Sequence, residues 1–112
     1  MGGFPAERDE VLKFINEKQI TGVIFITADV HYAAVARVPG DMGLKEFIVG
    51  PLGAQLGRAE RTSKRFEFFS RDFYSYGLVR VHAKAERPYV EIEILDQNNR
   101  LLRKSRVEAP AA

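Results

Sequence analysis

Apolar and polar positions follow a helical period near the amino terminus of this chain and a strand period over most of the remainder. In residues 6–20 the apolar side chains recur three and four positions apart, with charged side chains between them. These apolar positions are Val11, Leu12, Ile15 and Ile20, with Phe14 beside them. The spacing predicts an amphipathic surface helix with one buried stripe, with Pro5 in its first turn and Thr21-Gly22 as its stop.

The segments after this helix have the composition of β-strands. Residues 22–27 are a continuous β-branched and aromatic run without alternation, which predicts a central strand covered on both faces. Further strands are predicted at residues 32–38, 44–49, 76–84, 89–95 and 101–107, and the β signal already resumes at Phe66. Residues 39–43 predict a hairpin turn, residues 50–65 mostly loop, and residues 108–112 a frayed tail.

Alternation is clearest in residues 90–94. It places Val90, Ile92 and Ile94 on one face of a strand and Glu91 and Glu93 on the other, wet face. One amphipathic helix followed by a mostly β segment predicts the α/β (α+β) class. With 46% hydrophobic residues, the 112 residues suffice for one core, so a single domain over residues 1–112 is expected.

Charge and composition narrow the possible partners. Lys and Arg number 17 against 15 Asp and Glu, a surplus too small to predict a nucleic-acid partner. The chain has no Cys, so any metal would have to bind through His and carboxylates. The longest apolar run, residues 22–27, is too short to span a membrane, and the amino terminus lacks a signal pattern. A soluble piece without a membrane partner is expected, in a compartment that the composition leaves open.

The residues with the clearest chemical potential directly follow the predicted buried strand. Asp29 and His31 are two positions apart, so an extended backbone presents a carboxylate and an imidazole on the same side, as half of a metal site. Ligands of open α/β sheets bind beyond the carboxyl ends of strands, where this pair lies. The alternative is that Asp29 caps a turn and His31 is a semi-buried structural histidine.

Two other features of the sequence each have a functional and a structural interpretation. Arg58, Arg61, Lys64 and Arg65 follow the glycine-rich residues 50–57 and could contact a substrate phosphate, or they are solvated loop charges. Residues 50–53 are not a P-loop, because the Gly-Lys-Ser/Thr ending is missing. His82 shares its predicted strand face with Leu78 and Arg80, which favours a structural role.

Three segments resemble one known family in the same order and spacing. Residues 4–12 resemble the helix that precedes the last metal-ligand motif of PhoD-like (D-type alkaline phosphatase or phosphodiesterase) metallophosphatases. Residues 22–33 are similar to the family's strand that ends in Gly-Asp-x-His, and residues 75–79 with the closing hairpin are similar to its terminal strands. The resemblance covers nearly the whole chain. Ala28 departs from it, because the family has Gly at this position.

The resemblance implies that the chain is the carboxy-terminal portion of a phosphatase domain, part of a β-sandwich. It would contribute the last Asp-x-His motif of a metal-dependent phosphoester hydrolase, with Asp29 and His31 as metal ligands. Divalent or trivalent metal ions in the full enzyme would orient the phosphoryl group and activate a water. The Asp-His pair does not select the metal. Family members are often exported.

The remaining ligand motifs of a two-metal site are missing from this chain. The isolated chain is therefore expected to be inactive and to hold no metal stably. Its expected partners are the missing amino-terminal part of the same enzyme, a phosphoester substrate and, through uncovered sheet surface, further copies of itself.

Two other readings remain open from the sequence. One is a non-catalytic α+β module that binds an anion or polymer through the basic loop 58–65 and the aromatic side chains that follow it. The other is a purely structural assembly domain.

Overall fold

The predicted amino-terminal helix is present as α1, Pro5–Glu17, with Pro5 in its first turn. The computed structural model describes residues 4–28, 30–40, 43–53 and 64–110. The helix ends earlier than predicted, because Gln19 adopts a left-handed backbone conformation with φ 53° directly after the last turn. Thr21-Gly22 is therefore not its stop.

The buried stripe of α1 is narrower than predicted. Leu12 and Ile15 are buried, as expected. Val11, Phe14 and Ile20 remain exposed. None of the helices in the described ranges is both long and apolar enough to cross a membrane.

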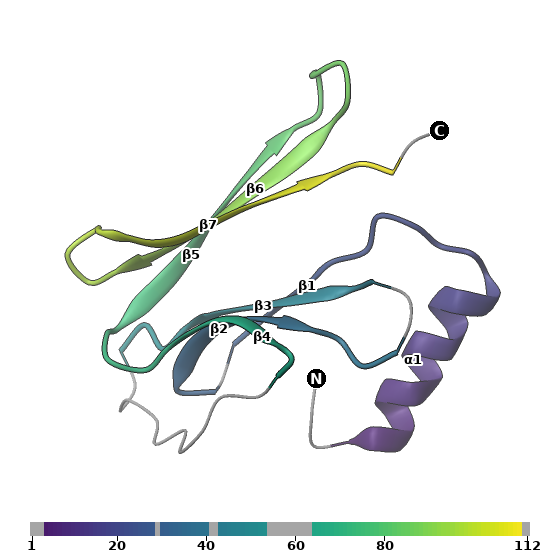
Figure 1. Ribbon diagram of the computed structural model, residues 1–112, viewed down its shortest axis with the longest axis horizontal. Helices are drawn as coiled ribbons and strands as arrows, with labels where there is room; N and C mark the ends of the chain where they lie inside the picture. Colours follow the sequence, from purple (N-terminus) through teal and green to yellow (C-terminus); the bar gives the residue numbers. More distant parts are fainter. Residues whose placement is uncertain (1–3, 29, 41–42, 54–63, 111–112) are drawn as a thin grey trace.

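The first sheet contains four strands in the order β1-β3-β2-β4 (Figure 1). Their bounds are Phe25–Thr27 for β1, Tyr32–Arg37 for β2, Lys45–Gly50 for β3 and Phe66–Ser70 for β4. The antiparallel β2–β3 pair is the predicted hairpin. Strand β1 runs parallel to β3. Strand β4 lies where the β signal resumes, although its bounds were not predicted.

The prediction of a central strand at residues 22–27 is wrong for this chain. Among the described residues only β3 pairs with β1, which makes β1 a three-residue edge strand. Ile26 is 48% exposed, so the strand is not covered on both faces. Gly22 has φ 73°, residues 23 and 24 do not pair with a neighbouring strand, and β1 begins only at Phe25.

The second sheet is an antiparallel meander of β5 (Ser75–His82), β6 (Tyr89–Asp96) and β7 (Leu101–Glu108). The alternation predicted for β6 is confirmed, since Ile92 and Ile94 are each 1% exposed. The prediction of a frayed tail over residues 108–112 is wrong for residues 108–110. Glu108 is the last residue of β7, and the Ala109 N–H donates to the Pro88 carbonyl.

The core lies between the two sheets, which confirms the α+β class. Ala33, Val35 and Phe47 of the first sheet pack against Ile92 and Ile94 of the second. In Figure 1 the three-stranded sheet lies above the four-stranded sheet, and α1 lies at the lower right. The burial of apolar side chains from β2, β3 and β6 is therefore what joins the sheets.

An ion-pair cluster also links the sheets at the end of the first sheet where β2 ends and β3 begins. Glu67 of β4 lies within 4.0 Å of three cationic side chains, those of Arg37, Lys45 and Arg103. Arg103 belongs to β7 and so comes from the second sheet. Half-exposed pairs of this kind contribute little energy each, so the cluster adds only slightly to the apolar contact between the sheets.

Strand β5 approaches β3 of the first sheet closely at Gly77. A Cβ atom at this position would lie 2.6 Å from Val49 Cγ1 of β3, closer than real Cβ contacts. Beside it, the Ser75 N–H donates to the Pro51 carbonyl at 2.8 Å. The start of β5 is thus held against the end of β3.

The lack of a side chain at residue 77 is expected to be required for this packing. Gly77→Ala should lower the free energy of unfolding by about 1–3 kcal/mol, because the added methyl group must push β5 away from Val49. Gly53→Ala is the matched control, since a Cβ at Gly53 has no atom within 4 Å. It should leave stability unchanged or raise it by up to about 1 kcal/mol. Urea unfolding of both variants measures the difference, and equal effects would contradict the packing argument.

Candidate functional site

A pocket of about 330 Å³ opens at the carboxyl ends of β1 and β3. Because these strands are parallel, with Thr27 paired to Ile48, the segments that follow them leave the sheet at the same edge. One wall comes from the segment after β1, one from the end of β3 and residues 51–53, and one from residues 75–77 of β5. This is the position at which open α/β sheets bind ligands.

His31 lines this pocket, together with Ala28 and Val30 of the same segment. It is exposed at the rim, just before β2 begins at Tyr32. An accessible imidazole at a pocket rim can bind a metal ion or transfer a proton. Asp29 lies outside the described residues, so its orientation toward the same side as His31 stays a prediction.

The described residues offer one candidate metal ligand here and do not fit a complete metal centre. No group of three or more His, Asp or Glu side chains in residues 4–28, 30–40, 43–53 and 64–110 is arranged to hold a metal ion. Of the described residues that line the pocket, His31 and Tyr76 alone carry an ionisable side chain. The Tyr76 hydroxyl donates to Asn99 Oδ1.

Arg65, one of the basic residues predicted to contact phosphate, does not lie near His31. Arg65 precedes β4, whose first residue pairs with Ala36 near the end of β2. His31 is at the opposite end of β2, so about 15–20 Å of strand separates the two. Arg65 instead packs its guanidinium 5.9 Å from the ring centre of Phe66. Arg58 and Arg61 lie outside the described residues.

A buried carboxylate that was not predicted from the sequence lies next to this site. Glu46 of β3 is 3% exposed, and its Oε2 atom accepts a hydrogen bond from Thr27 Oγ1 at 2.9 Å. Thr27 is the last residue of β1, directly before the segment that carries His31. The sequence did contain a sign of this burial. Side chains alternate between the two faces of a strand, so Glu46 shares a face of β3 with Ile48, which is buried. This bond holds the end of β1 against β3.

The other histidine lies away from the pocket. His82 stacks on Tyr89 with ring centres 4.3 Å apart, and its Nε2 is 3.7 Å from Glu91 Oε1. It is the last residue of β5, whereas the pocket is lined by the first residues of that strand. This geometry agrees with the structural role that the sequence favoured.

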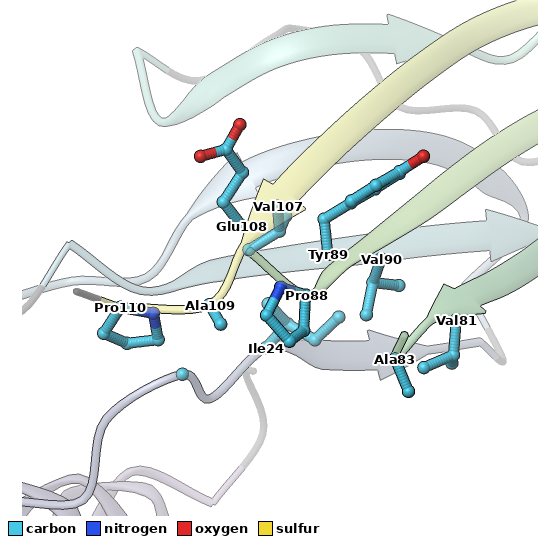
Figure 2. A pocket seen from close by; sticks show the side chains of 11 residues that line it. Ile24, Val81, Ala83, Pro88, Tyr89, Val90, Val107, Glu108, Ala109 and Pro110 are labelled. Carbon is cyan, nitrogen blue, oxygen red and sulfur yellow. The ribbon is translucent and has the colours of Figure 1, made fainter. Parts of the chain in front are cut away.

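A second concavity, the valine groove, has a volume of about 220 Å³ and lies beside β1 at the far end of the second sheet. Its lining is mostly apolar and includes Ile24, Val81 and Val90 (Figure 2). In Figure 2 the Glu108 carboxylate and the Tyr89 hydroxyl point away from Ile24. The valine groove therefore has the chemistry of a packing surface rather than of a metal or phosphate site.

Comparison with known proteins gives one family. The model of the family described as PhoD-like phosphatase matches residues 1–101 of the 112. No curated protein and no solved structure matches the chain.

The bond between Glu46 and Thr27 is expected to stabilise the fold measurably. Glu46→Ala removes the buried acceptor and should lower the free energy of unfolding by about 1–3 kcal/mol. Glu46→Gln keeps an oxygen that accepts from Thr27 Oγ1, so its loss should be smaller. Glu86→Ala, at an exposed position, is the control and should change stability by less than about 0.5 kcal/mol. Thermal and urea melts test whether stability falls most in Glu46→Ala, less in Glu46→Gln and least in Glu86→Ala. A Gln variant as unstable as the Ala variant would contradict the role of the hydrogen bond.

Proposed function

Because this chain belongs to the PhoD-like phosphatase family, we propose that it forms one wall of the active site of a metal-dependent phosphoester hydrolase. The observation that carries the proposal is the placement of His31 in a pocket at the carboxyl ends of two parallel strands. The Asp-x-His motif of residues 29–31 follows the first of these strands directly.

In this proposal His31 is a metal ligand, and Asp29 is a ligand or orients one. Metal ions bound there would lower the pKa of a coordinated water and stabilise the charge that develops on the phosphoryl oxygens. The described residues do not complete such a centre. We propose that Asp29 and the amino-terminal part of the enzyme supply the remaining ligands. This is why we expect the isolated chain to be inactive.

The other residues of the chain have a positioning role in the proposal. Thr27, bonded to Glu46, fixes the strand end from which the ligand segment departs. The Ser75–Pro51 hydrogen bond fixes the opposite wall. A ligand held within a few tenths of an ångström by such bonds costs less reorganisation when metal and substrate bind.

The alternative of an aromatic, polymer-binding surface has less support. Phe68 packs against the core. The rings of Tyr32, Phe66 and Phe69 pack on one another, with ring centres 5.2 to 6.0 Å apart. These rings are half-buried and are engaged within the fold rather than presented for stacking on bases.

The exposed edge of β1 supports the proposed partners. Ile26 is 48% exposed at this edge, and Val79 and Val81 of the second sheet are 40% and 69% exposed although they share a face with the buried Ile92. An open strand edge beside uncovered valines is suited to pairing with another strand. We propose that the amino-terminal part of the enzyme covers this edge, and that copies of the chain cover it when the chain is alone.

The first test separates metal ligation from a structural role. His31→Ala and Asp29→Asn should each change the free energy of unfolding of the chain by less than about 1 kcal/mol, since His31 is exposed. In an enzyme that contains the remaining ligands, the same changes should depress phosphoester hydrolysis by orders of magnitude. Urea melts of the chain and steady-state kinetics of the longer enzyme provide the two readouts.

His82→Ala is the matched control for this test. It removes a stacked ring and should destabilise the chain while leaving the rate constant per folded enzyme unchanged. The wild-type chain alone should hydrolyse aryl phosphates no faster than buffer with metal added. Marked destabilisation by His31→Ala together with near-normal activity would overturn the assignment of His31.

Self-association of the isolated chain is expected at micromolar concentration. Light scattering should show a dimer or a larger species, because the β1 edge and the valine groove expose apolar surface. Ile26→Lys should shift the population toward monomer, whereas Leu101→Lys, an equally exposed position on β7, should not. Monomer at all concentrations would contradict the expectation.

A further inference from the structure

The pocket beside His31 is apolar on most of its surface, which bears on the substrate of the proposed enzyme. We propose that it binds the alcohol part of the phosphoester, and that this part is an aromatic ring or a short branched aliphatic group. The inference rests on the proposed function, in which His31 marks the position of the phosphoryl group.

The side chains that face this pocket are the first argument. Val30 and Leu52 are 38% and 75% exposed, on two different walls, and Val49 lies between them at the end of β3. Gly50 and Gly53 add backbone without side chains. Exposed apolar side chains that line one pocket gain free energy when an apolar group displaces water from them.

The lack of charged side chains in the described lining also favours an apolar ligand. No Lys, Arg, Asp or Glu is present in the described lining of this pocket. The Tyr76 hydroxyl, which could bind a sugar or glycerol hydroxyl, already donates to Asn99. Among the described lining residues, a polyhydroxylated alcohol would find few side-chain partners in exchange for its bonds to water, which disfavours it.

The size and rigidity of the pocket are the third argument. Its volume of about 330 Å³ is at the small end of ligand pockets, and a closed apolar cavity of about 150 Å³ already holds benzene. One ring with a short linker fits in this volume. Gly77 in contact with Val49, and the Ser75–Pro51 hydrogen bond, hold two of the walls in place before any ligand binds.

Amide chemical shifts of the full chain, titrated with matched probes, test this proposal. Benzyl alcohol is compared with glycerol, and phenylphosphonate with methylphosphonate. The aromatic member of each pair should bind about tenfold more tightly, which corresponds to burial of roughly 50–60 Å² of apolar surface. The shifts should be centred on Val30, Leu52 and Gly77. Leu52→Ser should remove most of the tenfold difference, and Val81→Ser, in the valine groove, should preserve it.

Two outcomes would overturn the subsite: aromatic probes that bind no better than their polar partners, or shifts that centre on the valine groove. Benzyl alcohol has no phosphate, so its binding does not depend on hydrolysis. Aromatic preference at Leu52 with no effect of His31→Ala on the activity of the longer enzyme would overturn the proposed function and leave the subsite. Loss of activity in His31→Ala without aromatic preference would overturn the subsite alone.

Discussion

The contact between Gly77 and Val49 is the constraint on which the arrangement of the two sheets depends. A side chain at residue 77 would collide with Val49, so only glycine allows β5 to start directly against the end of β3. The Ser75–Pro51 hydrogen bond fixes the same point along the strands. With this end held, Ile92 and Ile94 of β6 lie over Val35 and Phe47, and the core closes.

The same contact builds the candidate site. Residues 75–77 are one wall of the pocket that His31 lines, and the ends of β1 and β3 are the others. A shift of β5 away from Val49 would therefore change both the core and the pocket. Stability and the shape of the pocket are coupled here through one glycine, whereas His31 is exposed and does not contribute to the core.

The two edge strands of the first sheet, β4 and β1, differ in how well they are tied to the rest of the fold. Strand β4 carries half-buried aromatic side chains, and Glu67 ties it to β7 through Arg103. Strand β1 is three residues long, pairs on one side among the described residues, and borders an apolar groove. The open edge and the incomplete ligand set lie at the same strand, which is why we propose that one further segment supplies both.

The sequence by itself determined the helix, the β2–β3 hairpin, the three carboxy-terminal strands and the family, because local periodicity and motif order carry that information. It also located His31 at the end of a strand. It could not show that residues 22–27 form an edge strand, since an apolar run looks the same whether one neighbour or two cover it.

Only the tertiary structure decided which distant residues meet. The partnership of Glu46 with Thr27, and the separation of Arg65 from His31, depend on strand order and direction, which no local pattern encodes. Strand pairing between residues far apart in the chain is a property of the whole packed sheet, in which burial of one face selects the register.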